Sequence, residues 1–189
     1  MVDCKPVTTS MELNFKNLCG NATGPELGND FEYRQLIGAL MFLVNTHTDI
    51  CFPVNTLSQY MVDPHHIQWV VTKNLLRYLQ GTITHGLRYT TENVRLHGNV
   101  RMHGYSNVDW ADNVVDHKRT FGWCFSLGSA SISWMSRKQK SVSLSTAKAE
   151  YIATSMASCE VFWLRKLFSE LFGHVLDTTL ILCDNQSGI

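Results

Sequence analysis

The sequence predicts an α/β fold in which a small helical segment precedes three antiparallel strands, a long helix and a fourth strand. The first observation is a pair of aromatic-rich runs, 120–127 and 131–136, joined by a Gly-Ser turn. The second is a helical pattern from Ser145 to about Phe172, followed by a glycine. The third is the run 178–183, which is rich in threonine, leucine and isoleucine. A strand that returns after a helix can pair parallel to the first strand of the same sheet.

The first part of the chain, residues 1–85, is predicted to be helical after an irregular lead-in. Residues 1–30 are polar and carry several glycines and prolines. Asp30 is expected to cap a helix over 31–45, and a second helix is expected over about 49–61. A third helix is expected over about 64–79, with Gly81 as its stop signal.

The second part, residues 86–189, is predicted to contain the sheet. Residues 86–103 alternate loosely between apolar and polar side chains, as in a hairpin. A strand beginning near Val100 is expected to end at Tyr105–Asp109. The helix that starts at Ser145 then leads to the strand over 178–183, in the order given above.

Composition limits the class of protein. Apolar residues make up 44% of the chain, which is typical of a globular protein, and 16 basic residues balance 16 acidic ones. The six scattered cysteines include no Cys-x-x-Cys pair, so they are expected to be reduced core thiols rather than zinc or redox ligands. Because neither a signal region nor a membrane span is apparent, an intracellular location, cytoplasmic or nuclear, is expected.

Acidic residues at the ends of predicted elements are the candidates for chemistry. Asp109 ends a predicted strand, Glu150 lies in the second turn of the long helix, and Asp184 follows the last strand. Carboxylates at such points can converge in the fold although they are distant in sequence. Converging carboxylates can hold the two divalent metal ions that promote attack on a phosphodiester.

The amino-acid motifs in these segments, and their order along the chain, resemble the ribonuclease H domain of copia-type retrotransposon polyproteins. The segments that carry the resemblance are Gly104-Tyr-Ser-Asn-Val-Asp-Trp-Ala111, Ile132-Ser-Trp-Met-Ser-Arg-Lys-Gln-Lys140, Ser145-Thr-Ala-Lys-Ala-Glu-Tyr-Ile-Ala153 and Cys183-Asp-Asn-Gln-Ser187. The earlier part resembles the stretch that follows the reverse transcriptase palm in the same polyproteins, through Tyr33–Gly38, Asn45–Ile50 and Leu76–Thr82.

The resemblance implies a ribonuclease-H-like domain over 86–189 and a reverse transcriptase connection or thumb-like segment over 1–85. It also implies Mg²⁺ as cofactor, an RNA–DNA hybrid or other nucleic acid as partner, and no membrane. Glu150 and Asp184 match two of the family's catalytic and metal-binding acids. Asn107 stands where the family has its first catalytic aspartate. Asparagine offers one neutral carbonyl oxygen in place of an anionic pair.

Two further departures from the family pattern affect the activity that is expected of this chain. Lys148 stands where the family usually has a glutamate, and the chain ends at Ile189, before the family's next helix, final strand and fourth acidic residue. The chain is therefore expected to be a truncated, degenerate domain that is inactive or very weakly active. A truncated edge near 178–183 is expected to favour self-association.

Each candidate residue also has a simpler interpretation. Glu150 alone would be read as a solvated helical side chain, and Asp184 as a helix N-cap. Asp109 is a further candidate metal ligand that could partly replace the lost carboxylate, or a turn residue. A basic stretch after a predicted strand either touches a phosphate backbone or is a solvated turn; its residues are Arg137, Lys138 and Lys140.

Two classes of function therefore stay open. The first is a retrotransposon-derived ribonuclease H that has lost most or all of its activity. The second is a non-catalytic nucleic-acid-binding or protein-binding module that reuses the fold. A fragment without a cellular role is the third possibility.

Overall fold

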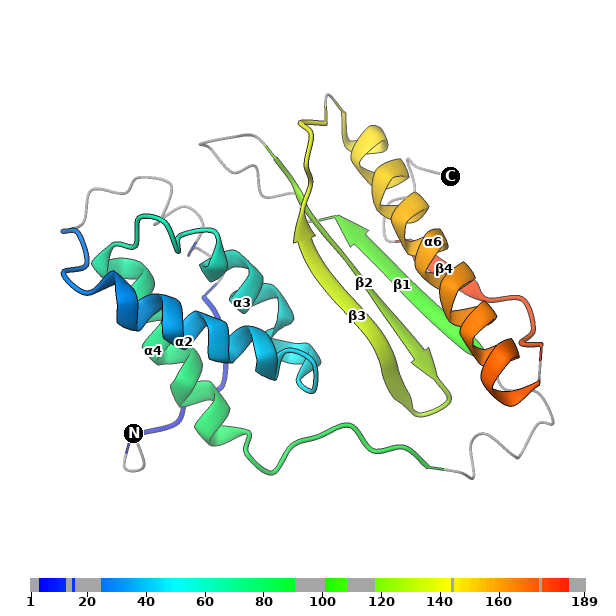
Figure 1. Ribbon diagram of the computed structural model, residues 1–189, viewed down its shortest axis with the longest axis horizontal. Helices are drawn as coiled ribbons and strands as arrows, with labels where there is room; N and C mark the ends of the chain where they lie inside the picture. The colour runs from blue at the N-terminus through cyan, green and yellow to red at the C-terminus, as the bar shows by residue number, and fades with distance from the viewer. Residues whose placement is uncertain are drawn as a thin grey trace. The chain divides into compact units, whose positions relative to one another are not determined.

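The structure is a computed structural model that describes residues 4–12, 15, 25–90, 101–108, 118–143, 145–173 and 175–183. The chain divides into two compact units, with the division between Gly86 and Leu87. The first unit holds the helices α2, α3 and α4, and the second holds a four-stranded sheet with the long helix α6 (Figure 1). The mixed α/β class predicted from the sequence is confirmed.

The helical unit is built from α2 (Asp30–Leu43), a 3₁₀ turn η1 (Thr48–Ile50), α3 (Cys51–Ser58) and α4 (His66–Gly81). Its core is a cluster of apolar side chains from all these elements; from the described part of the lead-in, Phe15 is buried in it, and Met11 and Leu27 pack against it. The fully buried members contributed by the helices and the turn are Tyr33, Ile37, Ile50, Val54, Leu57 and Leu75.

The predicted starts of two helices were wrong by a residue or two, for reasons of capping. Asn29, not Asp30, is the N-cap of α2, because its side chain accepts a hydrogen bond from the backbone N–H of Glu32. In α4, His65 is the N-cap and forms a reciprocal capping box with Gln68. Gln68 is fully buried, so this cap is part of the core and not only a surface signal.

One hydrogen bond joins η1 to α4 across the helical unit. The Tyr78 hydroxyl donates to the Asp49 carboxylate at 2.6 Å. This bond, with partial burial and the negative charge of Asp49, raises the pKa of Tyr78 to about 12. Since the folded-state pKa lies above the ordinary value of 10.0, the contribution to stability is complete below pH 10 and is lost as the pH rises towards about 12.

Asp49→Asn is therefore expected to lower the pKa of Tyr78 towards its ordinary value. Phenolate absorbance at about pH 11 measures this, because most unperturbed tyrosines are ionised there. The unmodified chain and Tyr78→Phe should absorb alike at that pH, since Tyr78 is still largely protonated. Asp49→Asn should gain the absorbance of most of one phenolate, and an unchanged spectrum would contradict the assignment.

The sheet unit has the strand order β3-β2-β1-β4. The strands are β1 (Met102–Val108), β2 (Thr120–Leu127), β3 (Ala130–Lys138) and β4 (Leu180–Cys183). β1, β2 and β3 are antiparallel neighbours, and β4 pairs parallel to β1 through the register Ser106 with Cys183. The predicted strands and the predicted parallel return are confirmed, although β3 is longer than expected and β4 shorter. The hairpin predicted for 86–103 is absent from its described part, because 86–90 form no strand; 91–100 lie outside the described residues.

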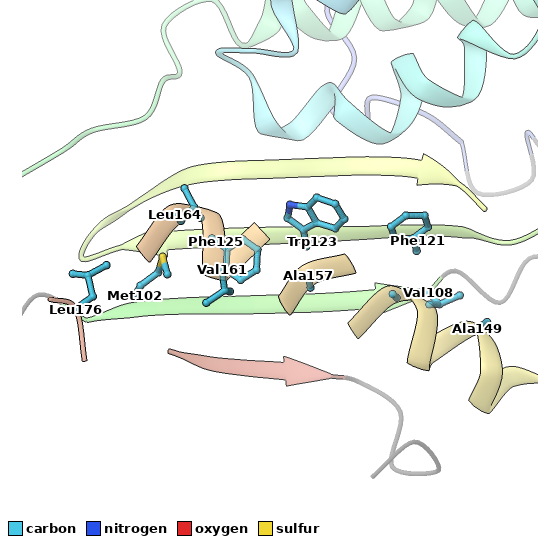
Figure 2. Packing of buried hydrophobic residues seen from close by; sticks show 11 residues of the cluster. Met102, Val108, Phe121, Trp123, Phe125, Ala149, Ala157, Val161, Leu164 and Leu176 are labelled. Carbon is cyan, nitrogen blue, oxygen red and sulfur yellow. The ribbon is translucent and has the colours of Figure 1, made fainter. Parts of the chain in front are cut away.

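Helix α6 (Thr146–Phe172) covers one face of this sheet. The Ser145 side chain caps it by accepting from the N–H of Lys148 at 3.2 Å, and Gly173 ends it at φ 65°, as predicted. Three alanines, at 149, 153 and 157, are fully buried at spacings of four residues. Small side chains on this stripe let the helix lie close to the aromatic residues of β2, Phe121, Trp123 and Phe125 (Figure 2).

Polar contacts hold the C-terminal half of α6. The Ser133 hydroxyl of β3 donates to the Glu160 carboxylate at 2.7 Å. Further along the helix, Arg165 donates to the backbone carbonyls of Leu176 and Asp177, just before β4. The end of the helix is thus joined to the segment that leads into the fourth strand.

Strand β4 has one neighbour, β1, among the described strands. Its side chains Leu180 and Leu182 are 58% and 45% exposed. Self-association through this edge stays a prediction. The predicted reduced cysteines are free thiols at the five described positions, but the core location was wrong: four are half-buried and Cys159 is exposed.

Candidate functional site

Two of the four acidic-site positions predicted from the sequence lie in described elements. Glu150 is in α6 and Asn107 is in β1. Asp109 and Asp184 lie outside the described residues, so their predicted roles as metal ligands, catalytic groups or caps stay predictions.

Glu150 sits in the second turn of α6, on the side that meets the sheet. Its neighbours on that side are Ala149 and Ala153, which are both fully buried, and Glu150 itself is only 8% exposed. The alternative of a solvated helical side chain is therefore wrong. A carboxylate buried to this degree loses most of its water of hydration.

Asn107 is the second-last residue of β1, and its side chain is exposed. Side chains alternate along this strand: Met102, Ser106 and Val108 are buried, while Asn107 lies between two of them and faces the other way. Met102 and Val108 belong to the cluster that packs against α6. Asn107 therefore belongs to the sheet face opposite α6, and the described structure does not bring it onto the same face as Glu150.

This arrangement bears on the magnesium ions that the resemblance implies. Such sites are built from several hard, anionic oxygen ligands converging on the metal. Within the described ranges, no group of three His, Cys, Asp or Glu side chains lies close enough to hold a metal ion. What these ranges offer is one buried carboxylate and one neutral carboxamide on opposite faces, and this set does not fit a two-metal site.

The predicted basic stretch lies at the end of β3. Arg137 and Lys138 are the last two residues of the strand, and Lys140 is exposed just after it. The antiparallel register adds two basic residues that the sequence reasoning missed. Lys118 and Arg119 directly precede β2, whose first residue pairs with Lys138. Lys118 and Arg119 are nearly twenty residues from Arg137 and Lys138 in sequence. Only the β2–β3 register brings them together, at the open end of the hairpin opposite its turn.

A second group missed by sequence reasoning surrounds Gln139. This side chain is 3% exposed and forms hydrogen bonds with Ser143 and with the backbone of Ala149. In the sequence, Gln139 reads as one more polar residue in a basic run, so no pattern marks it as buried. Its role appears only when β3 and α6 are placed together.

The part of the chain that the structure describes contains no helix with the length and apolar character needed to cross a membrane.

Comparison with known proteins gives homologues over nearly the whole chain. The retrovirus-related Pol polyprotein from transposon RE2 of Arabidopsis thaliana is 37% identical over 98% of this chain. The retrovirus-related Pol polyprotein from transposon TNT 1-94 of Nicotiana tabacum is 33% identical over 100% of it. This chain spans only 12% and 14% of the lengths of these two polyproteins.

A shorter relative covers part of the same region. The secreted RxLR effector protein 161 of Plasmopara viticola is 41% identical over 70% of this chain and 90% of its own length. No family model and no solved structure matched. The chain therefore belongs to the same sequence family as a segment of the retrovirus-related Pol polyproteins of copia-type transposons.

Proposed function

We propose that the sheet unit is a ribonuclease-H-like domain derived from a retrotransposon Pol polyprotein, and that its hydrolytic activity is lost or very weak. The main support for the ribonuclease-H-like fold is the topology of the sheet unit. Three antiparallel strands, a long helix and a fourth strand parallel to the first give the order β3-β2-β1-β4. This is the order expected for that fold, and the homologous polyproteins support the same origin.

The residue at position 107 is the reason to expect a loss of activity. In this class of enzyme, two divalent cations activate the attacking water and stabilise the leaving oxygen. At position 107 the chain has a neutral side chain on the face opposite the one covered by α6, which carries Glu150. Removing a central anionic ligand weakens metal binding and disturbs metal spacing. The expected effect is a fall of several orders of magnitude in the hydrolysis rate.

The unmodified chain is expected to show no cleavage of the RNA strand in a labelled RNA–DNA hybrid above background with Mg²⁺ or Mn²⁺. Asn107→Asp is expected to recover no more than a trace, because the new carboxylate would stand on the sheet face opposite α6. Gel analysis of the labelled strand measures both. Asn45→Asp, which makes the same charge change at an exposed position of the helical unit, is the matched control.

Two outcomes of this experiment would decide against the proposal. Metal-dependent cleavage by the unmodified chain that disappears in Glu150→Gln would show that the site is intact. Strong cleavage by Asn107→Asp, again lost in Glu150→Gln, would show that position 107 is the single lesion and that the two faces do meet at the site.

A second function is favoured by the basic residues at the end of the β2–β3 hairpin. Lys118, Arg119, Arg137, Lys138 and Lys140 gather there although the chain as a whole has no net charge. Such a group suits contact with phosphates and implies affinity that falls steeply with salt. Hybrid binding without cleavage, weakened by neutralising Arg137 and Lys140 together, would favour a non-catalytic nucleic-acid-binding module.

A further inference from the structure

We propose that Gln139 is a positioning residue that holds the first turns of α6, and with them Glu150, against the end of the β2–β3 hairpin. The assignment of Glu150 to a ribonuclease-H-like site rests on the proposed function, whereas the effect of Gln139 on the position of Glu150 does not.

Gln139 is bonded in three directions. Its backbone N–H donates to the carbonyl of Arg119 at 2.8 Å, which extends the β2–β3 pairing by one step beyond Lys138. Its side-chain Nε2 donates to the carbonyl of Ala149 at 3.1 Å, and its Oε1 accepts from the Ser143 hydroxyl at 2.7 Å. One residue thus joins the start of β2, the β3–α6 loop and the second turn of α6.

These hydrogen bonds stabilise the packing of α6 on the sheet because the groups that form them are buried. Gln139 is 3% exposed, and Ser143 is 9% exposed. A buried amide that loses its partners keeps the cost of lost hydration, so the arrangement that supplies those partners is strongly favoured. The residue therefore fixes a distance between the sheet and the helix.

The acceptor of the Nε2 bond is what connects Gln139 to the candidate site. Ala149 immediately precedes Glu150; both are buried, and Ala149 packs in the cluster between α6 and the sheet. The N-terminal turns of a helix are otherwise the part most prone to fraying, because their N–H groups lack helical partners. Here Ser145 caps the end from within the same segment, while Gln139 anchors the same turns from outside it.

The test uses carboxylate labelling of the full chain, with carbodiimide and glycine ethyl ester, read by peptide mass spectrometry. Gln139→Met keeps the length of the side chain and removes both bonds of the amide. Labelling of Glu150 is expected to rise several-fold in this variant. Glu160, on the same helix and held by Ser133, should label at the unchanged rate.

The pH dependence of Glu150 labelling in Gln139→Glu distinguishes an effect of the hydrogen bond to Ala149 from an effect of side-chain packing at position 139. Once ionised, the carboxylate introduced at position 139 cannot donate to the Ala149 carbonyl, whereas the protonated acid can. Its folded-state pKa is therefore expected to be raised, so stability is present at low pH and is lost as the pH rises through that pKa. Labelling of Glu150 should follow the same curve, and Gln139→Met should show no such dependence relative to the unmodified chain. Six charged residues are bonded to Gln139 or adjacent in sequence to it or to its bonded partners: Lys118, Arg119, Lys138, Lys140, Lys148 and Glu150. All six are unchanged in the variants and in the unmodified chain.

Gln35→Glu makes the same chemical change at an exposed position of α2 and should leave Glu150 labelling unchanged. Equal rises at Glu150 and Glu160 would mean general loosening of α6 and would overturn the proposal. Unchanged labelling of Glu150 in Gln139→Met would overturn it as well. Neither result depends on hybrid cleavage, so failure of the proposed function would be recognised separately.

Discussion

Replacing Phe125 by alanine is expected to destabilise the sheet unit by about 3–5 kcal/mol, the usual cost of emptying a buried aromatic site. Phe125 has no exposed surface and lies at the centre of the cluster between β2 and α6 (Figure 2). The neighbouring β1 position is Gly104, which leaves the space that the ring fills. Native-state amide hydrogen exchange over 101–108 and 120–138 measures the loss within this unit alone.

A double-mutant cycle tests the stated cause of that loss. A Cβ added at Gly104 would lie 2.2 Å from Cε1 of Phe125, so Gly104→Ala is itself expected to cost about 1–3 kcal/mol. In Gly104→Ala with Phe125→Ala, the methyl group enters the space left by the ring. The combined loss should therefore be smaller than the sum of the two. Simple additivity would show that the ring and the glycine do not share this space.

Replacing Tyr33 by alanine is expected to cost the helical unit a similar amount, about 3–5 kcal/mol. Tyr33 has no exposed surface, and its hydroxyl donates to the carbonyl of Leu57 at 2.8 Å. Tyr33→Phe is the matched control: it removes only the hydroxyl, and it should cost about 1 kcal/mol. The Leu57 carbonyl still accepts from the N–H of Tyr60 in that variant, so no buried carbonyl is left without a donor. Hydrogen exchange over 30–81 measures both losses.

The two core substitutions also test the division of the chain. The cluster around Tyr33 contains only residues of the helical unit, and the cluster around Phe125 only residues of the sheet unit. Each substitution is therefore expected to lower protection in its own unit and leave the other unchanged. Loss of protection in both units after either substitution would show that they unfold together.

The sequence by itself predicted the elements whose signals are local. The long helix was marked by Ser145 and Gly173, which act on the backbone of neighbouring residues only. β2 was marked by its aromatic run and the turn after it. The start of α2 was misplaced by one residue, because adjacent asparagine and aspartate are both good caps and only the hydrogen bond from the N–H of Glu32 identifies Asn29 as the cap.

The relation between the site positions could not be read from local signals. The family motifs put Asn107 and Glu150 in one site. Side chains alternate along any strand, but which of the two faces α6 covers is a property of the packed sheet. The same holds for Lys118 and Arg119, which the β2–β3 register brings to the predicted basic stretch.

The sequence by itself determined the order and type of the main helices and of strands β1 to β4, the family, and the neutral side chain at 107. What only the tertiary structure decided is which side chains are buried and which share a face. No sequence pattern marks Gln139 as buried, and for Glu150 a packed and a solvated position were both open; the structure shows that both side chains are buried. The physical reason is that burial and hydrogen-bond partners arise between elements distant in sequence, whereas capping and periodicity act within a few residues.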